Sequence, residues 1–144
     1  MKRQTRLIRY DKEFYSSIAT LKDQLSCKEP LPLGINGLSD GIANAYLAEA
    51  LFELSESGAQ PSLVIVPSDK ERERICSFLS SVGLKAFEYK SREFVFHNIS
   101  ASHDTERERL FVLSKILSGE CDVVVTTPSA ALAYTMPRKT LESL

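Results

Sequence analysis

A glycine-rich run at residues 34–41 is the first candidate for chemistry. It reads Gly-Ile-Asn-Gly-Leu-Ser-Asp-Gly and precedes a long helical pattern. A phosphate-binding loop of the GxxxxGK[ST] type wraps phosphates with backbone N–H groups, neutralises them with lysine and holds Mg²⁺ through a hydroxyl. When the run is aligned from Gly34, Ser39 takes the second glycine position, Asp40 the lysine position and Gly41 the hydroxyl position.

The acidic residue in the lysine position decides what this run can bind. Its carboxylate would repel a triphosphate, and the charge-assisted contacts of lysine are missing. An alignment from Gly37 fares no better, because Ile42 and Ala43 then stand where glycine and lysine are needed. We expect a sharp turn into a helix capped by Ser39 or Asp40, with weak backbone binding of an anion as the open alternative. The positions of this degenerate, inactive nucleotide loop are Gly34, Gly37, Ser39, Asp40 and Gly41.

Two later segments carry candidate contact residues. Residues 91–97 place a base and two phenylalanines, two positions apart, after an expected strand; they could stack on a DNA strand or meet a partner, or both rings could be buried on one side. Residues 105–109 alternate acid and base, which favours a solvated, salt-bridged helix start over a docking role. The candidate docking or DNA-contact residues are Arg92, Phe94, Phe96, Arg107 and Arg109.

No residue set has the spacing of a catalytic or metal centre. The cysteines and histidines form neither a CxxC nor an HxxxH pattern. His97 and His103 have no nucleophile pattern beside them, so we expect ordinary surface or helix-start histidines. Cys27, Cys76 and Cys121 are expected to be buried free thiols in a reducing cytosol. We therefore predict no catalytic residue, no metal and no cofactor within this chain.

Helical patterns alternate with short apolar strands along the chain. Helices are expected at residues 11–26, 42–57, 68–81, 105–118 and 129–134, and strands at 31–35, 62–66, 85–89 and 122–126. Ser68 is expected to cap the third of these helices, because Glu71 follows it by three residues, as in a capping box. The run at 62–66, Ser-Leu-Val-Ile-Val, is typical of a strand buried on both faces of a parallel sheet, whereas 91–103 is expected to be irregular. The alternation predicts a three-layer α/β domain with a mostly parallel sheet of about four strands.

Composition excludes several classes of protein. The chain has 144 residues, 43% of them hydrophobic, with 18 basic and 19 acidic residues and a net charge of -1. This balance indicates a soluble domain with no bulk charge for a nucleic-acid or membrane partner. The longest apolar runs are a handful of residues, whereas a transmembrane helix needs roughly 20. No apolar segment follows the basic start at residues 2–12, so we expect a solvated terminus and no secretory signal.

The order of these motifs resembles the N-terminal UvrB-homology region of the bacterial transcription-repair coupling factors, the Mfd family. The resemblance rests on the Gly34–Gly41 run before a helix, the strand Leu63–Pro67 opening a helix, the run His103–Leu110, and the strand-to-helix run Asp122–Leu132. It covers residues 31–137, and it is carried by the order and spacing of the motifs.

This resemblance implies a RecA-like, P-loop-type fold with a degenerate nucleotide loop. It implies a helix and connector at residues 1–30, a UvrB-like α/β sub-domain of a larger protein at 31–137, and the start of a linker at 138–144. Members of the family are cytoplasmic ATPases that push stalled RNA polymerase off damaged DNA and recruit nucleotide-excision repair. Their ATPase residues match no position here, since Asp40 replaces the lysine and no acidic pair ends the strand at 122–126.

The function implied for this chain is that of a non-catalytic scaffold or docking module. ATP and Mg would belong to the motor domains of the parent protein. The implied partners are UvrA, through an adjoining sub-domain, and RNA polymerase and DNA, through other domains, with no membrane. Two alternatives stay open: a UvrB-like P-loop ATPase or helicase fragment, and a free-standing α/β anion-binding protein.

Overall fold

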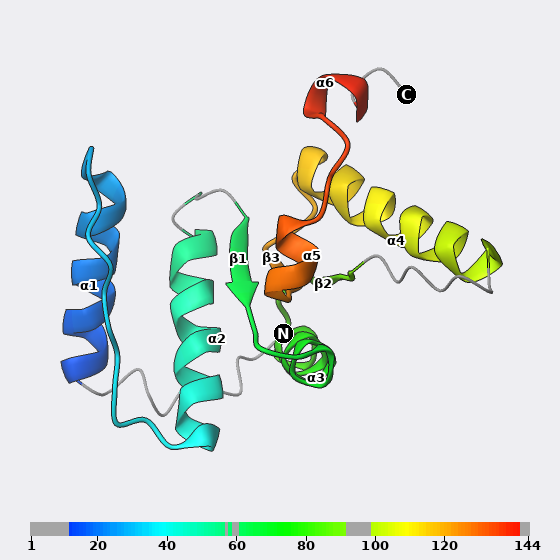
Figure 1. Ribbon diagram of the computed structural model, residues 1–144. Helices are drawn as coiled ribbons and strands as arrows, with labels where there is room; N and C mark the ends of the chain where they lie inside the picture. The colour runs from blue at the N-terminus through cyan, green and yellow to red at the C-terminus, as the bar shows by residue number, and fades with distance from the viewer. Residues whose placement is uncertain (1–11, 57, 59–60, 92–98, 142–144) are drawn as a thin grey trace. The chain divides into compact units, whose positions relative to one another are not determined.

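The computed structural model describes residues 12–56, 58, 61–91 and 99–141 of the chain (Figure 1). The chain divides into two compact units, Met1–Gln60 and Pro61–Leu144, each of which is described by itself. In chain order the described elements are α1 (Lys12–Ser26), α2 (Asp40–Glu56), β1 (Ser62–Ile65), α3 (Asp69–Ser81), β2 (Ala86–Tyr89), α4 (Ile99–Leu117), β3 (Val123–Thr126), α5 (Pro128–Leu132) and α6 (Arg138–Leu141).

The first unit is built on contacts between α1 and α2. Phe14 and Ile18 lie one turn apart on α1 and are buried with Ala50, while Tyr46 of α2 packs against them. The rings of Phe14 and Tyr46 meet edge to face at 5.0 Å between centroids. The bounds of both helices agree with the expected ranges to within about two residues, because the apolar spacing of the sequence matches the helical period.

The second unit holds a parallel sheet of three described strands in the order β1-β3-β2. Val123 of β3 pairs with Ser62 on one side and Ala86 on the other, and the register continues to the strand ends. All four residues of β3 are buried, as its central place in the sheet requires. The chain is therefore an α/β protein, and the strands expected at 62–66, 85–89 and 122–126 are confirmed.

Helices cover both faces of this sheet. Tyr89 and Val124 lie on one face and are buried with Val112 of α4. Side chains alternate along a strand, so Glu88 lies on the opposite face, where it accepts a hydrogen bond from Arg72 of α3 at 3.3 Å. Helices α3 and α4 therefore pack on opposite faces, as the connections of a parallel sheet require.

The strand expected at 31–35 is wrong. Residues 30–36 form no strand, and residues 31–35 are all exposed. Pro30 and Pro32 each lack the N–H that a sheet ladder uses, so this stretch can offer few backbone hydrogen bonds to a neighbouring strand. Among the described residues the sheet has three strands rather than about four.

The loss of that strand leaves β1 at an edge of the described sheet. Leu63 and Ile65 are 59% and 55% exposed, so the expected burial of this strand on both faces is wrong. Both side chains lie on the face that α4 covers, as the register with Val124 and Thr126 shows. Because α4 makes its main contacts with β2, the β1 side of that face is left open.

The helix expected at 105–118 begins earlier, at Ile99, so the irregular stretch expected at 91–103 is wrong for residues 99–103. Residues 92–98 lie outside the described part of the chain. The sequence Ile-Ser-Ala-Ser-His at 99–103 holds no glycine or proline that would stop a helix. An acidic residue at position 104 therefore lies inside the helix and does not cap it.

We predict that Leu79→Ala destabilises the protein far more than Leu63→Ala. Leu79 is fully buried, so its truncation removes transfer free energy and leaves a cavity, at a cost of about 2–5 kcal/mol. Leu63 is mostly exposed, and its truncation is expected to cost no more than about 0.5 kcal/mol. Guanidinium unfolding followed by circular dichroism measures both free energies, and equal losses would contradict the burial described above.

Candidate functional site

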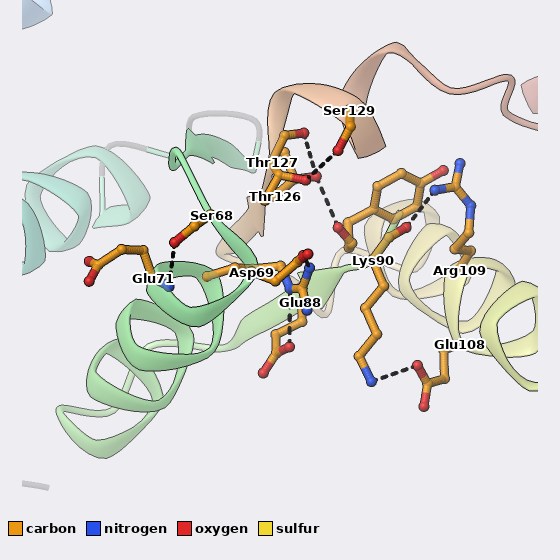
Figure 2. A network of polar contacts seen from close by, with 12 residues as sticks. Ser68, Asp69, Glu71, Glu88, Lys90, Glu108, Arg109, Thr126, Thr127 and Ser129 are labelled. Carbon is orange, nitrogen blue, oxygen red and sulfur yellow. Dashed lines mark hydrogen bonds and ion pairs between the residues drawn. The ribbon is translucent and has the colours of Figure 1, made fainter. Parts of the chain in front are cut away.

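Several polar contacts of the second unit lie at the carboxyl ends of the three strands. Ser68 follows β1 and accepts a hydrogen bond from the backbone N–H of Glu71 at 3.3 Å, which confirms that serine as the cap of α3 (Figure 2). Thr126 ends β3 and donates from Oγ1 to the carbonyl oxygen of Tyr89 at 2.9 Å. This edge of a parallel sheet is where α/β proteins bind ligands.

A group of ion pairs surrounds a polar hollow of about 340 Å³ at this edge. Arg72 is buried and pairs with both Asp69 and Glu88. Lys90 pairs with Glu108 at 2.8 Å, and the hydrogen bond that the ammonium donates to that carboxylate raises the pKa of the lysine. Each of these two cations already has a carboxylate partner, so the described lining of the hollow carries no excess positive charge for a phosphate.

Arg109 is the most deeply buried cation described in this unit, with 2% of its surface exposed. Its Nη1 donates to the carbonyl oxygen of Lys90 at 2.6 Å, and its Nη2 to that of Tyr134 at 3.3 Å. The guanidinium also stacks over the ring of Tyr89, 4.2 Å from the centroid. Figure 2 shows it reaching from α4 toward the end of β2.

These contacts hold residues 133–137, here named the strap, across the end of β2. The hydroxyl groups of Tyr89 and Thr135 are 2.9 Å apart and form a hydrogen bond. Thr135 also accepts from Arg109 Nη2 at 3.5 Å and donates to the carbonyl oxygen of Ala133. The strap is therefore fixed to the sheet and to α4 by side chains that come from three separate segments.

The glycine-rich run lies in the first unit, which contains none of the described strands. Residues 34–39 are exposed, and Gly37 has a φ of +82°, which a side chain would strain. The carbonyl oxygen of Ser39 accepts from Ala43 N at 2.8 Å, so that serine occupies the capping position of α2, which begins at Asp40. The run is the turn into a helix that its sequence predicts.

The residues around this turn do not suit a phosphate. The run lines a hollow of about 320 Å³ together with α1 and α2. Among the described residues of that lining the one ionisable carboxylate is Glu13, and none is lysine or arginine. Phe14, Ile42 and Tyr46 supply most of the opposite wall, so the hollow is apolar with an acidic edge.

The structure describes two of the five candidate docking or DNA-contact residues, and these two differ in burial. Arg92, Phe94 and Phe96 lie outside the described residues. Arg107 is 83% exposed, and its Nη1 lies 4.0 Å from Asp104, so this part of the run is solvated and salt-bridged as expected, although α4 begins earlier, at Ile99. Arg109, two positions later, is buried beneath the strap, so the fold brings no two of the described candidates together.

Two of the three cysteines are buried. Cys76 and Cys121 are buried free thiols as expected, but Cys27 is exposed, so that expectation is wrong for one of the three. Burial raises the pKa of Cys76 to about 11 and also raises that of Cys121. His97 falls outside the described residues, and His103 falls within α4.

Sequence reasoning missed the strap and the hydroxyl pair that fixes it. Thr135 stands in a stretch without regular spacing, and Tyr89 reads only as the end of a strand. The burial of Arg109 could have been predicted from the sequence. Helical spacing places this residue on the same face as Val112 and Leu113 rather than on the solvated face of Arg107.

Comparisons with known protein families, with curated proteins and with solved structures found no match to this chain. The described residues hold no group of three or more His, Cys, Asp or Glu side chains placed to bind a metal ion. None of the helices in the described ranges is both long and apolar enough to cross a membrane. The resemblance to transcription-repair coupling factors therefore rests on the sequence motifs.

We predict that one thiol reacts quickly with Ellman's reagent at pH 8. Cys27 is exposed, whereas the raised pKa of Cys76 leaves roughly a thousandth of it as the reactive thiolate. Cys27→Ser should abolish the fast phase, and denaturant should release all the remaining thiols. Fast reaction of two or three thiols in the folded chain would contradict the burial of the other cysteines.

We predict that Tyr89→Phe destabilises the protein by about 1 kcal/mol, because it leaves the strap hydroxyl of Thr135 without that hydrogen bond. The matched control is Tyr134→Phe, since the ring of Tyr134 is 73% exposed and its loss of a hydroxyl should have almost no effect. Urea unfolding of the two variants and the wild type measures the difference. Equal stabilities of the two variants would show that the hydroxyl pair does not fix the strap.

Proposed function

We propose that this chain is a non-catalytic scaffold or docking module, the UvrB-like part of a cytoplasmic transcription-repair coupling factor. Residues 1–30 would be its leading helix and connector, 31–137 the sub-domain itself and 138–144 the start of a linker. By resemblance, its parent would contact UvrA through an adjoining sub-domain, and RNA polymerase and DNA through other domains. ATP and Mg²⁺ would act in the motor domains of that parent.

One observation carries the proposal: the glycine-rich run is a helix-start turn, and the described residues that line the hollow beside it include no lysine or arginine. A phosphate loop needs glycines that bring backbone N–H groups to the phosphates and a lysine that neutralises them. Here Asp40 takes the lysine position, and the hollow beside the run carries Glu13 at its edge. This supports a module that has kept the outline of a nucleotide fold without its chemistry.

The finer architecture is part of the same proposal. A parallel sheet with α3 and α4 on opposite faces supports kinship with RecA-like cores. The nucleotide loop of such a core would here be the degenerate turn at residues 34–41, which follows no strand among the described residues.

Exposed apolar side chains support the docking role. Leu132 at the end of α5 is 87% exposed, and Tyr134 and Phe111 are also mostly exposed. Aromatic and apolar groups of this kind are enriched in protein interfaces, with arginine beside them. Arg107 on α4 is the described basic candidate that is free to reach a partner's surface.

We predict that the purified 144-residue chain shows no saturable binding of fluorescent ATP with Mg²⁺ up to about millimolar nucleotide, which is the range of a few weak contacts. The reasons are the acidic residue at position 40 and the lack of lysine or arginine among the described residues that line the hollow beside the run. Fluorescence anisotropy measures the binding, and Asp40→Lys is the matched variant that restores the charge of a nucleotide loop.

Saturable micromolar binding by the wild-type chain would overturn the proposal. The P-loop ATPase or helicase fragment would then be the better supported function. Binding that appears only in Asp40→Lys would agree with the proposal, since it would show that charge at this one position separates this turn from a working loop.

A further inference from the structure

A third hollow, of about 300 Å³, opens between α4 and the strap. Its apolar wall comes from four side chains, Leu110, Leu113, Met136 and Pro137, together with the rings of Tyr89 and Tyr134. It lies at the carboxyl end of β2, because Tyr89 is the last residue of that strand. Pockets that bind small molecules begin at about this volume, and in α/β proteins they lie at this edge of the sheet.

A buried positive charge lines the same hollow. The guanidinium of Arg109 is almost wholly removed from water, yet its hydrogen-bond acceptors are two carbonyl oxygens and one hydroxyl, all neutral. Among the described residues no ion pair joins a carboxylate to it. A buried cation is stabilised by a compensating negative charge, and a bound anion can supply one at this position.

The guanidinium also keeps hydrogen-bonding capacity for a ligand. It carries five N–H donors, and the contacts to Lys90, Tyr134 and Thr135 engage Nη1 and Nη2. Among the described residues Nε–H meets no acceptor. A carboxylate can accept a charge-assisted hydrogen bond from this remaining donor, which is about twice as strong as a bond between neutral groups.

Glu106, one turn before Arg109 on α4, also lines the hollow and has partners of its own. Its charge opposes an anion, so the ligand's carboxylate must lie on the Arg109 side. This arrangement gives the two ionisable residues opposite effects on the same ligand.

We propose that this hollow binds a small monocarboxylate with an apolar or aromatic body. The carboxylate pairs with the guanidinium of Arg109, and the body packs against the apolar wall beneath the strap. The site is separate from the glycine-rich turn of the first unit and does not depend on the docking function. Binding involves no bond making or breaking.

The test is a titration of the ¹⁵N-labelled full chain with phenylacetate, followed by NMR, beside the neutral isostere phenylacetamide. We expect saturable shifts centred on Tyr89, Arg109 and the strap, with affinity of about millimolar or tighter for a probe of this size. The amide should bind at least about tenfold more weakly, because it lacks the charge that Arg109 needs.

Three variants and one matched control assign the binding to this hollow. Arg109→Gln should weaken phenylacetate binding by about tenfold or more, whereas Glu106→Gln should strengthen it by a few-fold. Thr140→Trp leaves the guanidinium intact and fills the hollow from its rim, so it should abolish binding even if Arg109→Gln fails to fold. Arg107→Gln removes an exposed charge two residues away and should leave the affinity unchanged.

Several results would overturn the proposal. They are the absence of saturable shifts up to about 20 mM phenylacetate, equal affinity for the amide, or unaltered binding by Thr140→Trp. Equal weakening by Arg107→Gln and Arg109→Gln would also do so, since it would assign the effect to net charge.

Discussion

The burial of strand β3 is the constraint on which the rest of the second unit depends. Its three valines and Thr126 are all removed from water, and each backbone edge of the strand pairs with a neighbour. A parallel strand of this kind needs cover on both faces and crossover connections that pass over the sheet. Helices α3 and α4 meet that need from opposite sides, which sends the carboxyl ends of all three strands to one edge.

The polar groups at that edge follow from the same constraint. Residues that leave a buried strand must either reach water or find partners at once, because unpaired buried polar groups are costly. Lys90 reaches Glu108, Thr126 bonds to Tyr89, and Arg109 takes up the carbonyl oxygens of Lys90 and Tyr134. The groups that fix the strap are thus the same groups that satisfy the hydrogen bonds of the backbone around the sheet.

Much of this architecture could be predicted from the sequence. The three strands were predicted correctly because short runs rich in apolar residues, set between helical patterns, are typical of strands in α/β proteins. Ser68 was predicted as a cap from its spacing to Glu71. The strand at 31–35 was predicted wrongly because its alternating Leu31, Leu33 and Ile35 favour a strand, while the prolines between them remove ladder donors. The apolar residues of this stretch favour a strand and its prolines disfavour one. Only the pairing of strands in three dimensions decides between the two.

The two candidate sites differ in how far they could be predicted from the sequence, for a related reason. A motif such as the glycine-rich turn is local, so the missing lysine could be judged from spacing alone. The hollow beneath the strap is assembled from β2, α4 and a stretch after α5, and no window of sequence contains it. Arg107 and Arg109 illustrate the difference most directly. They are two positions apart in an alternating run of acids and bases, yet helical geometry points one into water and the other beneath the strap. Charge pattern alone treats them as equal, whereas burial gives Arg109 the stronger electrostatic effect on anything that enters the hollow.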